Sequence, residues 1–173
     1  RSQAFLDHVA GHAATDVLLQ VTTPLTLAQA SKLAAAGFDM THNVAYTLRD
    51  YDTTLQPAML NPASAASVRG ATLVTALGDE LGNAMRFTSF DSRVNLRIEA
   101  GDGQDSIDAG RGDDQIVGGR GADTVNLTSK DNSSDTVVYQ TIYDGKTQPV
   151  VTVAFSSDPM DYRVGTHLTL HLK

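Results

Sequence analysis

Residues 100–126 consist of one nine-residue pattern written three times without a gap: AGDGQDSID, AGRGDDQIV and GGRGADTVN. Four positions of the pattern agree in all three copies. The second and fourth are glycine, the sixth is aspartate and the eighth is isoleucine or valine. A flexible linker rich in glycine and aspartate is the alternative interpretation. A random linker would not keep four positions in register over this length, so we interpret the segment as a structural repeat.

Each repeated position has a physical role in one kind of fold. Glycines at alternate positions allow a tight turn with positive φ and a close approach of backbone carbonyls. Aspartate supplies a hard anionic oxygen, which Ca²⁺ prefers. The aliphatic residue at the eighth position points inward from a very short strand. One apolar residue in nine cannot form a core alone, so neighbouring turns must stack, as in calcium-binding parallel β-structures with this pattern.

The nonapeptides resemble those of the RTX (repeats-in-toxin) proteins, a bacterial family exported by type I secretion. The resemblance implies a parallel β-roll in which two nonapeptides make one turn and Ca²⁺ ions lie between stacked loops. It implies that the aspartates of repeats n and n+2 share a site. The metal-site residues predicted in this way are Gly101, Gly103, Asp105, Gly110, Gly112, Asp114, Gly119, Gly121 and Asp123.

In this chain the n and n+2 rule pairs Asp105 with Asp123 in one complete calcium site. Asp114 belongs to the other edge of the roll. The preceding nonapeptide, residues 91–99, has Leu96 in place of the aspartate, and the following one, residues 127–135, has Asn132 and no glycine. We therefore expect a partial site at Asp114, with Asp131, Asn132 or Asp135 as the candidate partner. Asp102, Asp108 and Asp113 occupy variable positions, where we expect solvated charges.

The charge of the chain is concentrated in the repeats. The formal net charge is −7, and residues 99–123 contribute seven acidic and two arginine side chains, a net −5. This concentration argues against a nucleic-acid partner. It also predicts that the repeats are expanded without cations, because like charges repel and little apolar surface offsets the entropy. No cysteine is present, which excludes disulfides, and no apolar run approaches the ~20 residues of a membrane span.

Residues 1–90 have the spacing of an α/β region. We expect a helix over 3–14, strands over 16–22, 44–48 and 71–76, and a helix over 27–36 that Thr26 caps and Gly37 ends. Asp52 is expected to cap a short helix limited by Pro57 and Pro62. His8 and His12 share a helix face, but the sequence HVAGH lacks the glutamate of a zinc-peptidase helix.

The phrases LTLAQASKLAAAGF and YTLRDYDTTL resemble alanine-rich strand–helix repeats of large bacterial surface and secreted proteins. Leu19, Tyr46 and Leu73 are spaced 27 residues apart, which suits a solenoid-like array. An ordinary small α/β domain is the alternative. We expect a helical or looped join over 78–87 and the first strand of the roll at 94–98.

Three regions follow from these expectations: an α/β solenoid-like region over 1–90, an RTX calcium-binding β-roll over 91–135, and a C-terminal β-strand cap over 136–173. The cap is predicted from runs of β-branched and aromatic residues at 136–143, 150–155 and 161–172, with a turn at Asp144 and Gly145. It would cover the open end of the roll. Since the chain begins at Arg1 and ends just after a strand-like run, we expect a piece of a longer protein.

No nucleophile elbow, phosphate-binding loop or dinucleotide fingerprint is present, so we expect no enzyme activity. The first hypothesis is a calcium-binding structural module of a secreted or cell-surface bacterial protein of the adhesin or surface-layer type. The alternative is the C-terminal secretion and folding module of a type I-secreted protease or lipase. The expected partners are calcium ions, the type I secretion machinery, the cell surface and neighbouring repeats of the parent protein, and the expected location is extracellular.

Overall fold

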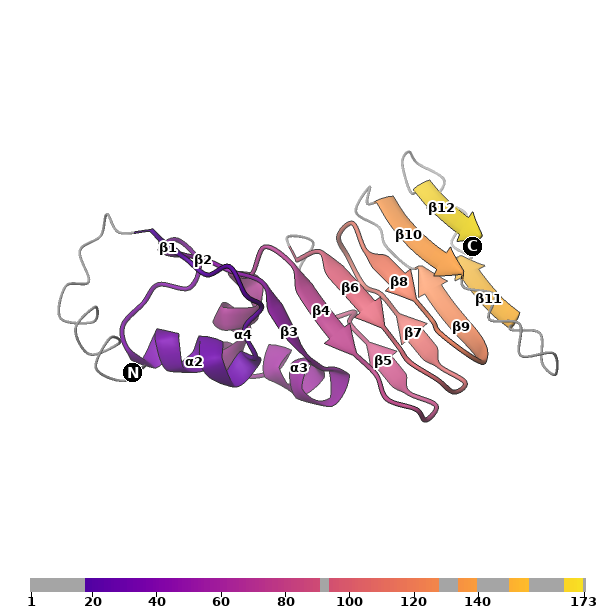
Figure 1. Ribbon diagram of the computed structural model, residues 1–173, viewed down its shortest axis with the longest axis horizontal. Coiled ribbons are helices and arrows are strands. Elements are labelled where there is room, and N and C mark those ends of the chain that lie inside the picture. Colours follow the sequence, from indigo (N-terminus) through magenta and orange to yellow (C-terminus); the bar gives the residue numbers. More distant parts are fainter. Residues whose placement is uncertain (1–17, 91–93, 128–133, 140–149, 156–166, 173) are drawn as a thin grey trace.

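The computed structural model describes residues 18–90, 94–127, 134–139, 150–155 and 167–172 (Figure 1). The described part is elongated, with its helices gathered at the N-terminal end and flat strands stacked towards the C-terminal end. The predicted helix at 3–14, with His8 and His12, lies outside the described residues, as does the predicted turn at Asp144 and Gly145.

The N-terminal region alternates strands and helices. Its elements are β1 (Leu19–Gln20), α2 (Leu27–Ala35), β2 (Val44–Ala45), β3 (Leu48–Tyr51), α3 (Asp52–Met59), α4 (Pro62–Arg69) and β4 (Val74–Leu77). The strands pair in parallel, β1 with β2 and β3 with β4. Parallel pairing requires a crossover between strands, and α2 and the α3–α4 pair supply it. The solenoid-like array itself stays a prediction.

Local signals set most helix boundaries in this region. Thr26 caps α2 through a capping box with Gln29, as the sequence predicts. The interpretation of Asp52 and Pro57 was wrong, because Tyr51 is the N-cap of α3, Asp52 lies in its first turn and Pro57 lies inside it. Pro57 is the sixth residue of this helix, so its missing N–H removes one hydrogen bond near the C-terminal end of α3. Pro62 begins a second helix, α4, that the sequence reading did not predict.

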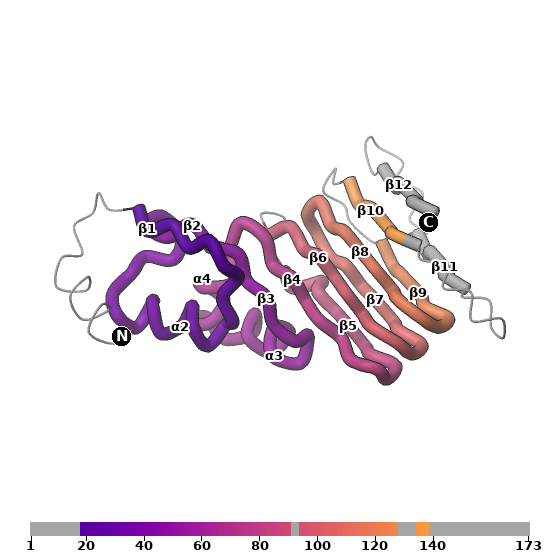
Figure 2. The backbone as a smooth tube through the Cα atoms, viewed as in Figure 1, coloured from indigo at the N-terminus to yellow at the C-terminus, as the bar shows by residue number. Residues whose placement is uncertain are grey.

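The C-terminal part is a parallel β-roll, as predicted. Its strands after β4 are β5 (Ala84–Arg86), β6 (Leu96–Glu99), β7 (Ser106–Asp108), β8 (Gln115–Val117), β9 (Ala122–Leu127), β10 (Ser134–Tyr139), β11 (Val150–Phe155) and β12 (His167–Leu172). Successive strands alternate between a six-stranded sheet, ordered β12-β10-β8-β6-β4-β3, and a four-stranded sheet, ordered β11-β9-β7-β5. Figure 2 shows the backbone winding between the two stacks.

The interior between the sheets is a ladder of apolar residues in register. Ile98 pairs with Ile116, and Ile116 pairs with Val137, along the six-stranded sheet. In the four-stranded sheet Met85 pairs with Ile107, and Ile107 with Val125. All of these side chains are buried. The eighth position of each nonapeptide therefore faces the core, and stacking gives each single apolar residue the neighbours that it lacks within its own repeat.

The roll begins earlier in the chain than the sequence suggests. Residues 78–87 contain strand β5 where the sequence indicated a helical or looped join, and β4 and β5 both precede the run at 94–98. Residues 84–86 form a strand because the buried Met85 side chain pairs with Ile107 and occupies an interior position of the roll. At the other end, β10, β11 and β12 pair in parallel with β8, β9 and β10 and so extend both sheets. Their role as a cap stays a prediction.

We expect Ile116→Ala to lower the free energy of unfolding by about 2–5 kcal/mol, because it leaves a cavity in the middle of the ladder. The measurement is urea denaturation at saturating calcium, followed by far-UV circular dichroism. Leu60→Ala is the control, since Leu60 is 79% exposed and its loss should change stability by less than ~0.5 kcal/mol. Equal effects of the two substitutions would contradict the ladder.

Candidate calcium site

Three loops stack along one edge of the roll, at residues 78–83, 100–105 and 118–123. Each follows a strand of the six-stranded sheet and leads into the four-stranded sheet. Backbone bonds join neighbouring loops. Asp102 N donates to Asp79 O at 3.1 Å, Gly103 N donates to Arg120 O at 2.7 Å, and Arg120 N donates to Gly101 O at 3.1 Å. The loops therefore continue the parallel pairing of the strands.

The stacked loops approach so closely that only glycine fits at the contact. Gly119 and Gly121 have φ values of 100° and 132°. A Cβ on Gly119 would lie 1.8 Å from Gly101 O, and a Cβ on Gly121 would lie 1.4 Å from Gly103 O. The second and fourth positions of the repeat thus bring backbone carbonyl oxygens of one loop against the next, where they are available as ligands for a hard cation.

The aspartates at the sixth position form a second ladder inside the loops. Asp123 Oδ1 accepts a hydrogen bond from Asp105 N at 3.0 Å, and Asp105 Oδ1 accepts one from Asn83 N at 2.7 Å. Both aspartates are buried, with exposed fractions of 2% for Asp105 and 1% for Asp123. The structure thus brings together the two residues that the sequence pairs.

The second carboxylate oxygen of each aspartate is buried without a hydrogen-bond donor among the described residues. Asp123 Oδ2 lies against its own loop, so closely that a Cβ on Gly118 would be 2.3 Å from it. A buried charged oxygen without a partner is costly. A cation between the loops would remove this cost, so the arrangement fits calcium.

The same burial changes the acidity of the pair. Burial is the largest cause that raises the pKa of Asp105, the hydrogen bond from Asn83 N opposes it in part, and the negative charges of Asp123, Asp79 and Asp102 add to it, so that the pKa reaches about 6. Burial also raises the pKa of Asp123. Both shifts mean that the folded loops disfavour the ionised aspartates when no cation is bound.

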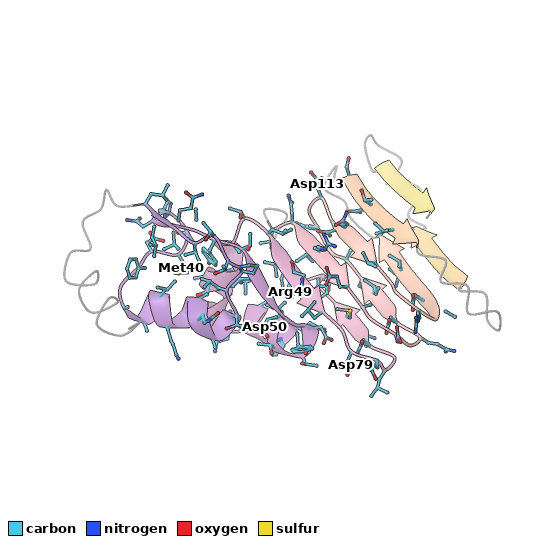
Figure 3. The ribbon with its side chains drawn as sticks, viewed as in Figure 1. Met40, Arg49, Asp50, Asp79 and Asp113 are labelled. Carbon is cyan, nitrogen blue, oxygen red and sulfur yellow. The ribbon has the colours of Figure 1, made fainter. Side chains whose placement is uncertain are left out.

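Figure 3 labels Asp113 and Asp79 at opposite edges of the roll. Asp114 follows Asp113 in the chain and belongs to the Asp113 edge. Asp114 Oδ1 accepts from Leu96 N at 2.9 Å, and Asp114 N donates to Asp135 Oδ1 at 3.1 Å. Among the described residues, the candidate partner Asp135 therefore stacks on Asp114.

Two of the partners proposed for Asp114, Asp131 and Asn132, lie outside the described residues. The glycines of this edge are also packed too closely for a side chain. A Cβ on Gly110 would lie 2.4 Å from Phe87 O, and a Cβ on Gly112 would lie 2.7 Å from Val94 O. This edge therefore has the same stacked-loop form, built on a preceding turn that has leucine in place of aspartate.

Aspartates at the variable positions have other roles. Asp102 is half exposed and lies 3.9 Å from Arg120 on the next turn. Asp108 Oδ1 accepts a hydrogen bond from Asn126 Nδ2 at 2.6 Å and its other oxygen lies 3.9 Å from Arg86. These contacts join successive turns at the surface, where ion pairs contribute little.

The loop at 78–83 was not recognised from the sequence as part of this stack. Aligned by its contacts with residues 100–108, residues 78–86 form a degenerate nonapeptide, GDELGNAMR, with Asn83 at the sixth position and Met85 at the eighth. The two other signature positions hold Asp79 and Leu81 in place of glycine. The available signal was the pair formed by an amide and a large apolar residue two positions later.

We expect Asp123→Asn to weaken calcium binding at least tenfold, because it removes the negative charge and keeps the acceptor for Asp105 N. Isothermal titration calorimetry measures the change. Asp102→Asn is the matched control, since Asp102 is exposed at a variable position and its loss should leave the affinity nearly unchanged. Identical binding curves for Asp123→Asn and the unsubstituted chain would refute the paired site.

We expect the stability of the calcium-free chain to fall as pH rises from about 4.5 to about 6. The folded pKa of Asp105 is about 6 and its ordinary value is 3.8, so the folded state binds the proton more tightly. The stabilisation that protonated Asp105 gives is fully present below its ordinary pKa and is lost as the pH rises through its folded pKa. Urea midpoints at several pH values measure this slope, which Asp105→Asn should flatten and which Asp102→Asn, the removal of a smaller cause of the shift, should reduce only slightly.

Two other carboxyl groups, Asp39 and Glu99, have lowered pKa values, and the pH window lies above the range in which they affect stability. Hydrogen bonds from Thr41 and His42 lower the pKa of Asp39 to about 2. Burial raises the pKa of Glu99, but its pairs with Arg97 and Arg49 outweigh burial and lower the pKa overall. Both groups lose their stabilisation below about pH 4.5, under the window. A slope of the same size in Asp105→Asn would exclude Asp105 as its source.

Comparison with known proteins supports the geometry. Residues 97–125 match the family model described as the RTX calcium-binding nonapeptide repeat, in four copies. The search of curated proteins gives no significant match, and neither does the search of solved structures. The matched residues include the loops at 100–105 and 118–123 and the apolar ladder between them. Residues 97–125 are thus RTX nonapeptide repeats of the calcium-binding kind.

Proposed function

We propose that the chain is a structural module of a secreted or cell-surface bacterial protein and that it folds fully when calcium binds outside the cell. The observation that carries this proposal is the pair Asp105 and Asp123, buried in stacked loops with one carboxylate oxygen each lacking a donor among the described residues. No catalytic role is proposed.

The residues that would hold calcium are the two carboxylates together with backbone carbonyls of the glycine positions, Gly101, Gly103, Gly119 and Gly121. Asp114 with Asp135, and the loop shaped by Gly110 and Gly112, would form the second position on the other edge. Calcium supplies positive charge that offsets the buried carboxylates. Because it binds the folded loops and not the extended chain, it stabilises the roll by mass action.

The charge distribution supports an extracellular setting. A net charge of −5 within residues 99–123 opposes compaction when calcium is scarce, and extracellular modules bind calcium with Kd of about 10⁻⁴–10⁻³ M. The repeats would stay expanded where calcium is scarce in the cytoplasm, and they would close outside after passage through a type I secretion system. None of the described helices is long and apolar enough to cross a bilayer.

The link between the two parts of the chain favours a scaffold, as in an adhesin or surface-layer protein, over a secretion module of a hydrolase. Strands β3 and β4 of the N-terminal region belong to the same six-stranded sheet as the roll. Arg49 on β3 bonds Glu99 on β6 at 2.8 Å, across β4. The roll and the α/β region therefore share a continuous sheet and core, as stacked units of one array do.

The test is a calcium titration followed by far-UV circular dichroism, with magnesium at equal concentration as the control. We expect a gain of β signal with a midpoint of about 10⁻⁴–10⁻³ M for calcium and no comparable gain with magnesium, which dehydrates reluctantly and demands octahedral geometry. A full β spectrum in excess chelator that calcium does not change would contradict folding on calcium binding.

A further inference from the structure

The loop at 78–83 is closed by its own side chains. Asn83 Oδ1 accepts from Asp79 N at 3.0 Å, Asn83 Nδ2 donates to Asp79 Oδ1 at 3.1 Å, and Leu81 N donates to the same oxygen at 2.8 Å. This loop spans as many residues as the loop at 100–105 on which it stacks. The neutral amide of Asn83, at the sixth position, thus closes its loop with hydrogen bonds. The next loop has the buried carboxylate of Asp105 at the same position.

The opposite edge of the same turn is closed by apolar packing. Phe87 and Phe90 are buried and meet edge to face, with ring centroids 5.1 Å apart and an interplanar angle of 84°. Phe90 N donates to Phe87 O at 2.9 Å, and Val94 is also buried. Aromatic burial of this size stabilises a turn without charged groups. Both edges of the turn that runs from β4 to β6 are therefore held by protein groups.

A glutamine covers the edge strand of the four-stranded sheet. Gln56, on α3, donates from Nε2 to Ala84 O at 3.2 Å and accepts at Oε1 from Arg86 N at 3.2 Å. In a parallel pair, one residue bonds the carbonyl before and the N–H after its partner. The Gln56 side chain makes the same two bonds around Met85, so it replaces a further strand at the edge of the sheet.

We propose that residues 18–90 and 94–99 fold without calcium and serve as the template on which the calcium-dependent turns of 100–127 assemble. The calcium-dependent assembly of 100–127 rests on the proposed function, and the calcium-independent folding of the template does not. The template presents backbone donors and acceptors to the next turn. Asn83 N donates to Asp105 Oδ1 at 2.7 Å, and Ser106 N donates to Asn83 O at 2.9 Å.

The template gives the roll a direction of assembly. Asp105 finds its donor on the calcium-free turn, and Asp105 N in turn donates to Asp123. Met85 offers a buried apolar surface to Ile107 in the same way. Each turn is thus the docking surface for the one that follows it in the chain, and the first such surface exists before calcium binds.

Hydrogen exchange of the whole chain, read by mass spectrometry in chelator and in calcium, tests the proposal. In chelator we expect amides of the elements from α2 to β5 to exchange at least about 100-fold more slowly than an unfolded chain, with those of 100–127 near the unfolded rate. Calcium should then protect 100–127. Asp123→Asn should abolish that gain without changing the N-terminal protection in chelator.

Two further variants test the contacts of the template. Asn83→Ala and Gln56→Ala should each raise the calcium midpoint for protection of 100–127 about five- to tenfold, because each removes hydrogen bonds from the turn that Asp105 docks on. Gln104→Ala, at an exposed variable position, is the matched control and should leave the midpoint unchanged.

The outcomes separate the two proposals. Fast exchange of the whole chain in chelator, with all regions gaining protection at one calcium concentration, would overturn the template, since it would show a single calcium-dependent unit. Unchanged midpoints in both Asn83→Ala and Gln56→Ala would also overturn it. Protection of 100–127 in chelator, unaffected by calcium, would overturn the proposed function and leave the calcium-independent fold of the N-terminal unit standing.

Discussion

The roll depends on one electrostatic constraint, the burial of carboxylates between loops that stack too closely for side chains to fill the gap. Backbone carbonyls of Gly101 and Gly103 meet the next loop, and Asp105 and Asp123 each place one oxygen where no described residue donates to it. Apolar packing cannot compensate alone, because each nonapeptide contributes a single interior residue such as Ile107. Neutralising these charges would therefore stabilise the stacked loops.

The first turn of the roll shows how the same backbone path can avoid that constraint. Its loop at 78–83 has the length of the loop at 100–105, but an amide replaces the carboxylate and bonds within the loop. Across the roll, Phe87 and Phe90 fill the interior. The turn closed by an amide and the turns with buried carboxylates therefore differ in side-chain chemistry, and their strands pair in the same parallel sheets.

The parts of the structure that repeat in sequence could be predicted, and those that depend on a neighbour could not. The spacing of Asp105 and Asp123 predicts their contact, and the run at Val150–Phe155 is the strand β11. Strand β5 gave no clear signal, because three residues with one buried methionine become a strand only when β7 and Gln56 supply partners. The three-residue offset that brings Asp135 to Asp114 is a property of the stacked turns and is invisible in a strict nine-residue alignment.

The eighteen-residue register between Ile98 and Ile116 has a mechanical consequence. Neighbouring strands lie about 4.8 Å apart, so one full turn adds only that much to the length of the rod. The same eighteen residues would span roughly 60 Å when extended. Under the proposed function, calcium would make this segment more than tenfold shorter along the roll axis than the same residues are at full extension. Whatever the chain anchors at its two ends would then be drawn together when the ion is present.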